Sequence, residues 1–233
     1  MSPGPLVDPA DVPAWLAGLV AATADLDASA LTRVRPPGRG SSAGLPTRSA
    51  AVLMLFGDGE NGPDVLLIRR ADTLNSHPGQ VAFPGGSADD TDRGPVDTAL
   101  REAEEEAGVL ADGVRPVALL PDLFVPVSGF MVTPVLALWE RPSPVRVVDP
   151  AETAAVARVP IAHLADPANR FRVRHPSGFS GPAFAAPGML VWGFTAGLLD
   201  GLLRLAGWER PWNSADVRDL DESLRAANAE VQA

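Results

Sequence analysis

Four glutamates lie within a short stretch, Arg101–Val109, which reads Arg-Glu-Ala-Glu-Glu-Glu-Ala-Gly-Val. At about 100° per residue, Glu102, Glu105 and Glu106 fall on one flank of a helix, and Glu104 points to the other. Like charges at i,i+4 and acidic residues in a last turn both lower helix stability. A hard divalent cation offsets this repulsion, because it binds clustered carboxylate oxygens. The spacing therefore indicates metal binding, with a solvated acidic face as the alternative.

The helix that carries these carboxylates has clear start and stop signals. Pro95 suits a first helical position, and Gly108 suits a C-terminal stop. An apolar stripe with several small residues, which predicts close packing on a sheet, is formed by Val96, Ala99, Leu100, Ala103 and Ala107.

The segment Gly86–Val109 resembles the Nudix box, the signature of the Nudix hydrolases. The second half of the pattern is filled by Arg101, Glu102, Ala103, Glu105, Glu106, Gly108 and Val109. Gly86 and Asp92 fill the first half, with one extra residue before Arg101 and Asp in place of the usual Glu. The resemblance implies hydrolysis of a nucleoside diphosphate linked to another group.

The preceding stretch, Leu66–Gly86, is similar to the coenzyme A pyrophosphatase subgroup through its His-x-Gly-Gln-Val-Ala-Phe-Pro-Gly-Gly core. Trp192–Ala196 also resembles that subgroup's C-terminal element. Ile68 stands where Ser or Thr is usual, and Asn75 where Arg is common. A missing Arg matters for coenzyme A, because its 3′-phosphate is a natural Arg ligand. The residues that would compensate are Arg69, Arg70 or Arg93.

The resemblance implies a role for each box residue. The ligands of Mg²⁺ or Mn²⁺ would be Glu102, Glu105, Glu106 and the Gly86 carbonyl. Arg101 would orient Glu105 through a charge-assisted hydrogen bond. The general base would be Glu105 or, on a distant loop, Glu152, for which a surface carboxylate is the alternative.

Substrate contacts are expected from the stretch before the box: Arg69, Arg70, His77, Gln80 and Phe83. His77 beside Pro and Gly can equally hold the loop, and Phe83 can equally be a core residue.

The expected activity is hydrolysis of coenzyme A or acyl-coenzyme A, with ADP-ribose or another nucleoside diphosphate as the alternative substrate. A catalytically silent Nudix domain that senses a ligand is the alternative of another class. All three box carboxylates are present, which favours the enzyme.

Composition limits the partners. The 233 residues, 24.3 kDa, carry 29 acidic and 19 basic side chains, a net charge of −10, and every basic residue is Arg. Such a chain has no general attraction for nucleic acid or anionic membranes. The chain has no Cys, which excludes thiolate chemistry. The uncharged stretch Gly181–Leu199 is interrupted by Pro and Gly, so the expectation is a cytoplasmic protein, with a homodimer left open.

The elements expected around the box are short strands and a few helices. The strands are Ala50–Phe56, Val65–Ile68, Val114–Leu120, Phe130–Trp139 and Thr153–Val159, the first two forming a hairpin. The helices are Val12–Leu26, Leu190–Leu205 and Val217–Val231, and Arg35–Arg48 is a linker. This mixture indicates an α+β fold, and the resemblance implies an α/β/α sandwich with a mixed sheet. The expected parts are residues 1–48, a domain at 49–206 and a helical extension at 207–233.

Overall fold

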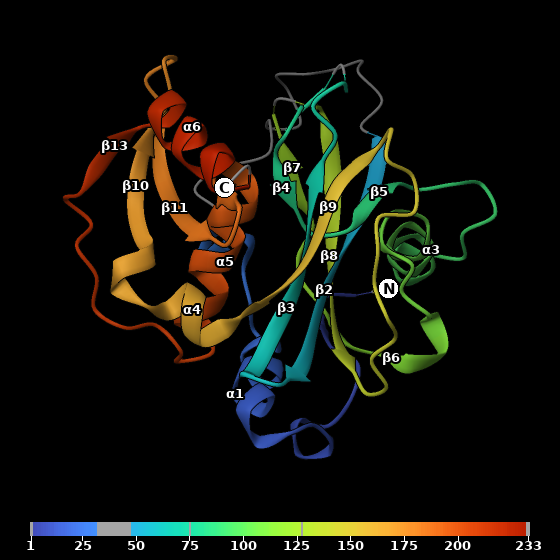
Figure 1. The fold of residues 1–233 in the computed structure, drawn as a ribbon. Helices are drawn as coiled ribbons and strands as arrows, with labels where there is room; N and C mark the ends of the chain where they lie inside the picture. The colour runs from blue at the N-terminus through green and yellow to red at the C-terminus, as the bar shows by residue number, and fades with distance from the viewer. Residues whose placement is uncertain (1, 32–47, 75, 127, 232–233) are drawn as a thin grey trace, which may run out of the picture.

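The computed structural model describes residues 2–31, 48–74, 76–126 and 128–231. Two mixed β-sheets and the helices around them form an α+β fold (Figure 1), as predicted. The strands are β1 (Gly4–Pro5), β2 (Arg48–Gly59), β3 (Gly62–Arg70), β4 (Val81–Ala82), β5 (Gly85–Ser87), β6 (Val114–Leu119), β7 (Leu123–Val125), β8 (Phe130–Trp139), β9 (Thr153–Pro160), β10 (Arg170–Arg174), β11 (Ser180–Ala186), β12 (Met189–Val191) and β13 (Val217–Asp219). The helices are α1 (Ala14–Ala22), α2 (Ala28–Leu31), α3 (Pro95–Ala107), α4 (Ile161–Ala165), α5 (Gly193–Leu205) and α6 (Leu220–Val231), with 3-10 turns at Pro9–Asp11, Ala111–Gly113 and Pro167–Asn169.

The larger sheet has the order β1-β6-β8-β2-β3-β4, with β5 on β2, β7 on β8 and β9 on β3. β2 and β8 run parallel, and β2 and β3 form the predicted hairpin across the turn between Gly59 and Gly62. β2 changes partner along its length: Phe56–Gly59 pairs with β3, whereas Ala50–Val52 pairs with β5. This change places the two glycines of β5 beside the start of β2.

Helices cover both faces of the larger sheet (Figure 1). Alternate β2 residues point to opposite faces, so Leu53 packs with the α3 side and Met54 with the α1 and α5 side. The small residues of α3, including Ala99 and Ala103, are fully buried against the sheet. The predicted apolar stripe therefore sets the close approach of α3 to the strands.

A second sheet, with the order β12-β11-β10-β13, lies beside α5 and α6 (Figure 1) and corrects two predicted helices. Leu190 belongs to β12, where it pairs with Ala185, so the helix predicted from Leu190 begins at Gly193 instead. Val217 pairs with Arg172 in a parallel ladder, so the last helix begins only at Leu220. Pairing with other strands therefore determines the conformation of both residues.

The N-terminal helix is shorter than predicted, since α1 spans only Ala14–Ala22. Thr23 follows the helix, and its hydroxyl donates a hydrogen bond to the Val20 carbonyl at 2.7 Å. The predicted linker Arg35–Arg48 lies outside the described residues except for Arg48, which begins β2. Within the described ranges, no helix has the length and apolar content to cross a membrane.

Candidate active site

The acidic helix α3 begins at Pro95 and ends before Gly108, as its sequence signals predict. Gly108 adopts a left-handed conformation with φ of 70°, and its N–H donates to the Glu104 carbonyl at 2.9 Å. α3 lies against β2 and β5. This placement brings the flank with Glu102 and Glu106 to the Gly85–Gly86 backbone.

Arg101 joins four oxygen-bearing groups around the start of this flank. Its Nη1 donates to Glu102 Oε1 at 3.0 Å and to Glu105 Oε2 at 3.1 Å. Its Nη2 donates to the Ser87 carbonyl at 2.9 Å, and Nε and Nη2 both reach the Asp92 carboxylate. Arg101 thus contacts Glu105, the residue that it is predicted to orient, and also Glu102.

Asp92 is the residue of this network to which sequence reasoning gave no role. It accepts hydrogen bonds from Thr98 Oγ1 at 2.8 Å and from the Asp89 N–H at 2.9 Å. Hydrogen bonds from Arg101 hold the pKa of Asp92 well below its usual range, and Asp92 in turn raises the pKa of Arg101. Its place in the box was the only available signal of this role.

Glu106 is the most buried carboxylate of the site, with 4% of its surface exposed. Its Oε2 accepts a hydrogen bond from the Gly85 N–H at 2.9 Å, and its Oε1 lies 3.7 Å from Arg70 Nη1. Burial raises the pKa of Glu106 to about 7, although the Gly85 hydrogen bond opposes the shift. Arg70 therefore provides a nearby positive charge for a carboxylate that water does not solvate.

The Glu102 carboxylate lies directly against Gly86. A Cβ added at Gly86 would stand 2.5 Å from the carboxylate carbon of Glu102, so a side chain there would displace it. Burial also raises the pKa of Glu102, against the opposing effect of Arg101. The absence of a side chain at Gly86 is thus needed for the position of Glu102.

Glu152 lies near this cluster although it is far away in sequence. Its carbonyl accepts a hydrogen bond from the Ala71 N–H at 2.8 Å, which ties its loop to the end of β3. The negative charge of Glu152 raises the pKa of both Glu102 and Glu106. Glu152 is therefore close enough to interact with both carboxylates.

Of the predicted substrate contacts, His77 and Gln80 lie together in a loop, whereas Phe83 lies in the core. His77, at φ of 55°, places Nδ1 3.0 Å from Gln80 Oε1, so these two side chains hold each other in the loop before β4. Phe83 is 3% exposed and belongs to the main core, which is the alternative that the sequence left open.

The arginines expected to compensate for the Arg that is missing at Asn75 all lie close to carboxylates. Arg69 binds Asp72 at 2.7 Å, Arg93 binds Asp97 at 2.7 Å, and Arg70 lies near Glu106. Asn75 itself lies outside the described residues.

The donor set suits a divalent cation, because it combines hard carboxylate oxygens with a backbone carbonyl beside a glycine cradle. As the described side chains stand, no three or more carboxylate or imidazole groups converge in a ready-made metal cage. The reason is that Arg101 holds Glu102 and Glu105, whereas Glu106 turns to Gly85. Rotation of these side chains would have to accompany metal binding.

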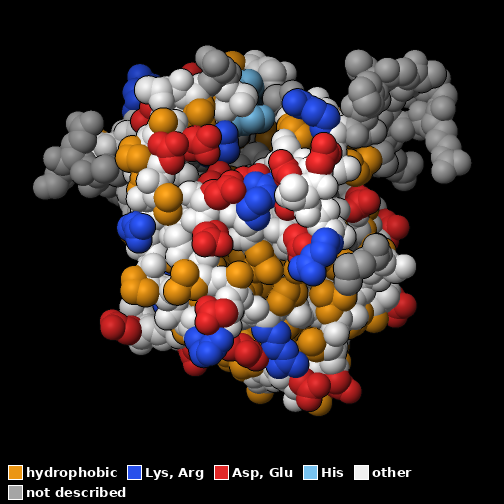
Figure 2. Space-filling view, turned by 90° about the vertical axis from the view of Figure 1, so that its right-hand side faces the viewer, with side chains coloured by type: hydrophobic (Ala, Val, Ile, Leu, Met, Phe, Trp, Pro, Cys, Tyr) orange, Lys and Arg blue, Asp and Glu red, His pale blue; other side chains and the backbone are white. Residues whose placement is uncertain are grey.

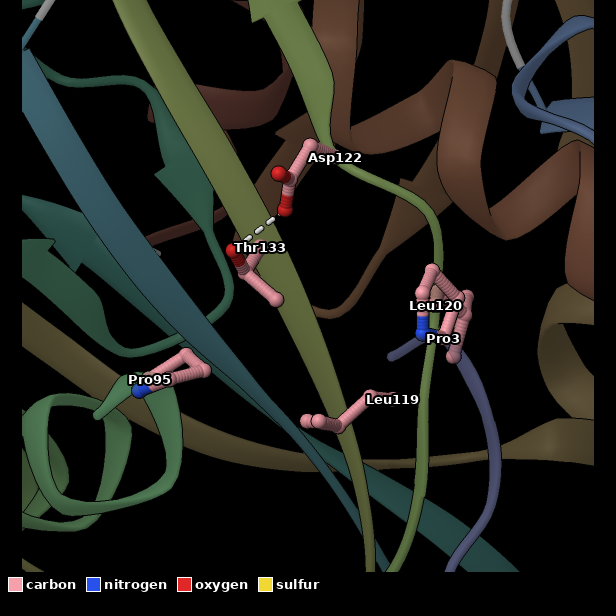
Figure 3. A pocket seen from close by; sticks show the side chains of 6 residues that line it. All are labelled: Pro3, Pro95, Leu119, Leu120, Asp122 and Thr133. Carbon is pink, nitrogen blue, oxygen red and sulfur yellow. Dashed lines mark hydrogen bonds between the residues drawn. The ribbon is translucent and has the colours of Figure 1, made fainter. Parts of the chain in front are cut away.

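The face of the molecule that carries α3 has acidic side chains interleaved with arginines, and histidine atoms border a hollow at its top (Figure 2). A separate pocket of about 220 Å³ opens near the first turn of α3 (Figure 3). In that pocket Thr133 donates a hydrogen bond to Asp122 at 2.6 Å, and none of the described residues that line it is basic. It is therefore a poor site for a diphosphate.

A model of the NUDIX domain matches residues 45–177, which include β2, the glycine turn and all of α3. The chain belongs to the Nudix family. Nudix domains typically use divalent metal ions, and a Nudix domain implies a small-molecule nucleotide substrate.

Similar proteins include an uncharacterized Nudix hydrolase, NudL, from Pectobacterium atrosepticum, 54% identical over 33% of this chain and 39% of that protein. The NudL of Escherichia coli K12 is 38% identical over 59% of this chain and 72% of that protein. The match to the first of these Nudix relatives thus spans under two thirds of its length. Among solved structures, the Nudix hydrolase RenU of M. smegmatis is 21% identical over 71% of this chain and 89% of that one, with a TM-score of 0.48.

Proposed function

We propose that this Nudix domain is a metal-dependent diphosphatase. It hydrolyses coenzyme A or acyl-coenzyme A to 4′-phosphopantetheine (or its acyl form) and adenosine 3′,5′-bisphosphate. The observation that carries the proposal is the gathering of Glu102 and Glu106 on the Gly85–Gly86 backbone, with Arg70 from the end of β3 beside Glu106. Arg70 belongs to the stretch Leu66–Gly86, which is the part of the chain that resembles the coenzyme A subgroup.

The reaction adds one water molecule across the diphosphate. The water oxygen forms a bond to one phosphorus, the bridging P–O bond breaks, and the bridging oxygen leaves on the other phosphate. One water proton passes to a base and the other stays on the new phosphate or passes to solvent.

Glu102, Glu105, Glu106 and the Gly86 carbonyl would hold Mg²⁺ or Mn²⁺, which neutralises phosphate charge and lowers the pKa of the attacking water. Arg101 donates a hydrogen bond to each of Glu102 and Glu105. Asp92 keeps Arg101 in place, so the chain itself orients two of the proposed ligands.

Glu105 and Glu152 are the two candidates for the base that takes the water proton. The Glu105 side chain is 57% exposed, so solvent water reaches it, and Arg101 fixes its position. Glu152 lies in the loop before β9, where its negative charge raises the pKa of both Glu102 and Glu106. Glu105→Gln and Glu152→Gln variants separate the two, because at saturating Mn²⁺ the variant that lacks the base should lose far more of its kcat than the other.

The side chains of Arg69, Arg70, His77 and Gln80 are proposed to contact the substrate. Arg70 is the best placed, because it lies beside Glu106 and its side chain remains partly exposed to solvent. Its guanidinium would donate to a phosphate oxygen of the substrate. Phe83, being buried, would support the β4 backbone from within the core.

Side-by-side turnover of coenzyme A and ADP-ribose with Mg²⁺ or Mn²⁺ tests the substrate. We expect adenosine 3′,5′-bisphosphate to accumulate from coenzyme A at a higher kcat/KM than AMP from ADP-ribose. Hydrolysis of ADP-ribose alone would contradict the coenzyme A assignment. Ligand binding without hydrolysis, unchanged in Glu105→Gln, would instead identify a silent sensor.

A further inference from the structure

Arg48 and Phe130 form a fixed cation–aromatic pair at one end of the larger sheet. The Arg48 guanidinium carbon lies 4.4 Å from the centre of the Phe130 ring. The two residues begin β2 and β8 and lie opposite each other in the parallel ladder. Arg48 is exposed and Phe130 half-buried, so the ring supports a charge that faces solvent.

This pair lies at the same end of the sheet as the Nudix box. Ala51, three residues after Arg48, lies opposite Gly86, and the Ser49 carbonyl accepts a hydrogen bond from the Ala88 N–H at 3.0 Å. Three residues of strand span about 10 Å. Arg48 is therefore separated from the Gly86 backbone by about the length of a ligand fragment such as a ribose with its phosphates.

Arg48 differs from the arginines nearer the box because it has no carboxylate partner in the described part of the chain. The preceding residues 32–47 contain no Asp or Glu, so that segment cannot supply one. A cation that no carboxylate neutralises, close to a site with many carboxylates, is suited to bind an anionic group of a ligand.

We propose that Arg48, positioned by the Phe130 ring, binds the 3′-phosphate of the adenosine end of the substrate. This inference rests on the proposed function. The planar guanidinium of Arg forms two parallel hydrogen bonds to phosphate, which Lys cannot reproduce. Arg48 thereby takes the role expected of the Arg that Asn75 replaces.

The geometry also defines the path of the ligand. Arg48 lies on the same face of β2 as Val52 and Met54, which point away from α3, whereas Glu102 lies on the α3 side. A nucleotide bound to both must pass over β5 beside the start of β2. β5 contains Gly85 and Gly86, so few side chains obstruct this path.

The test compares coenzyme A with 3′-dephospho-coenzyme A, which lacks only the phosphate in question. For Arg48→Met we expect KM for coenzyme A to rise about 10- to 100-fold, as for loss of a charge-assisted pair, while dephospho-coenzyme A changes less than about twofold. The KM of Arg48→Lys for coenzyme A should fall between those of the wild type and Arg48→Met. Phe130→Leu should lower the preference for coenzyme A over dephospho-coenzyme A. Arg174→Met, at an exposed Arg of the smaller sheet, is the matched control and should leave both substrates unchanged.

A second measurement needs neither metal nor turnover. Calorimetric titration in EDTA with adenosine 3′,5′-bisphosphate and with AMP should show that Arg48→Met weakens the binding of the bisphosphate and leaves the binding of AMP unchanged. An unchanged preference for the 3′-phosphate in Arg48→Met, in turnover or in binding, overturns the assignment of Arg48. If the wild type hydrolyses no coenzyme A, the proposed function fails, and the calorimetric comparison still decides the role of Arg48.

Discussion

Arg101 determines the arrangement of the box carboxylates because one guanidinium contacts Asp92, Glu102 and Glu105 at once. Asp92 is 6% exposed at its side chain, and its carboxylate also accepts hydrogen bonds from Thr98 and from the Asp89 N–H. Arg is suited to this position, since its five donors lie in one plane with fixed directions. The consequence is that Arg101 restrains the side chains of Glu102 and Glu105 on one flank of α3.

Arg101→Lys should therefore lower kcat/KM by about 10- to 100-fold, the range expected when a partner that orients ligands is lost. Lysine keeps the charge but cannot reach all three carboxylates. The matched control is Arg93→Lys, because the Arg93 side chain is 88% exposed and its pair with Asp97 contributes little. Equal activity of the Arg101→Lys and wild-type proteins would contradict an orienting role.

Glu106 makes the stability of the metal-free protein depend on pH. Its pKa is about 7 in the folded protein and near 4.5 when unfolded, so the folded state binds more protons between these values. The free energy of unfolding should accordingly fall as pH rises from about 4.5 to 7, by on the order of 3 kcal/mol from this group.

Urea unfolding in EDTA across this pH range checks the expectation. Glu106→Gln stays neutral at every pH, so its stability relative to the wild type should increase as pH rises. Glu104→Gln, an exposed change on the opposite flank of α3, should show no such trend. A constant difference between Glu106→Gln and wild type from pH 4.5 to 8 would contradict the buried, proton-binding carboxylate.

At the scale of elements, the site is an α3–β5 contact that depends on glycine. Gly85 packs so close to β2 that an added Cβ would collide with the Ala51 carbonyl. Gly86 leaves room for the Glu102 carboxylate. The two glycines therefore serve different contacts, one with the strand and one with the helix.

Gly86→Ala should displace Glu102 while leaving the fold intact, because the atoms it meets are the end of a flexible side chain. We expect kcat/KM to fall at least about 10-fold with a small change in Tm. Gly18→Ala in α1 is the matched control: its Cβ would meet nothing within 4 Å, and it should preserve activity and slightly raise Tm. Full activity of Gly86→Ala would show that the position of Glu102 does not matter.

Local signals predicted the acidic helix well, because Pro95, Gly108 and the period of its apolar stripe are all properties of one short segment. The same reasoning failed at Leu190 and Val217, because their conformation depends on pairing with Ala185 and Arg172. A short apolar run does not by itself distinguish a strand from a helix.

The candidate site likewise combines features that local sequence predicts with features that depend on distant segments. Periodicity alone placed Glu102, Glu105 and Glu106 on one flank. The nearness of Glu152, the hydrogen bond from Gly85 to Glu106 and the pairing of Arg48 with Phe130 arise only when distant strands meet. No local pattern in the sequence reports such contacts.

At the scale of the whole molecule, one core joins the larger sheet to elements from both ends of the chain. Leu16 of α1, Met54 of β2, Phe184 of β11 and Leu202 of α5 belong to a single buried cluster. Trp208 also contacts both Trp15 and Phe56 through its ring. Extensions beyond the Nudix box are thus part of the structure that supports β2.

Leu202→Ala should destabilise the whole protein by about 2–5 kcal/mol, because it opens a cavity in this shared core. Tryptophan fluorescence and far-UV circular dichroism should report the same single transition in the wild type and in the variant. An earlier separate transition in one of these signals would show that the C-terminal elements unfold on their own.

The flank of α3 that carries Glu102, Glu105 and Glu106 is proposed to bind a divalent cation. Calorimetric titration with Mn²⁺ at pH 8, where Glu106 is mostly ionised, tests it in the wild type, Glu106→Gln and Glu104→Gln. We predict saturable Mn²⁺ uptake by the wild type and Glu104→Gln, and at least about 10-fold weaker binding by Glu106→Gln. No uptake by the folded wild type, with or without coenzyme A present, or equal affinity in Glu106→Gln, would contradict the account.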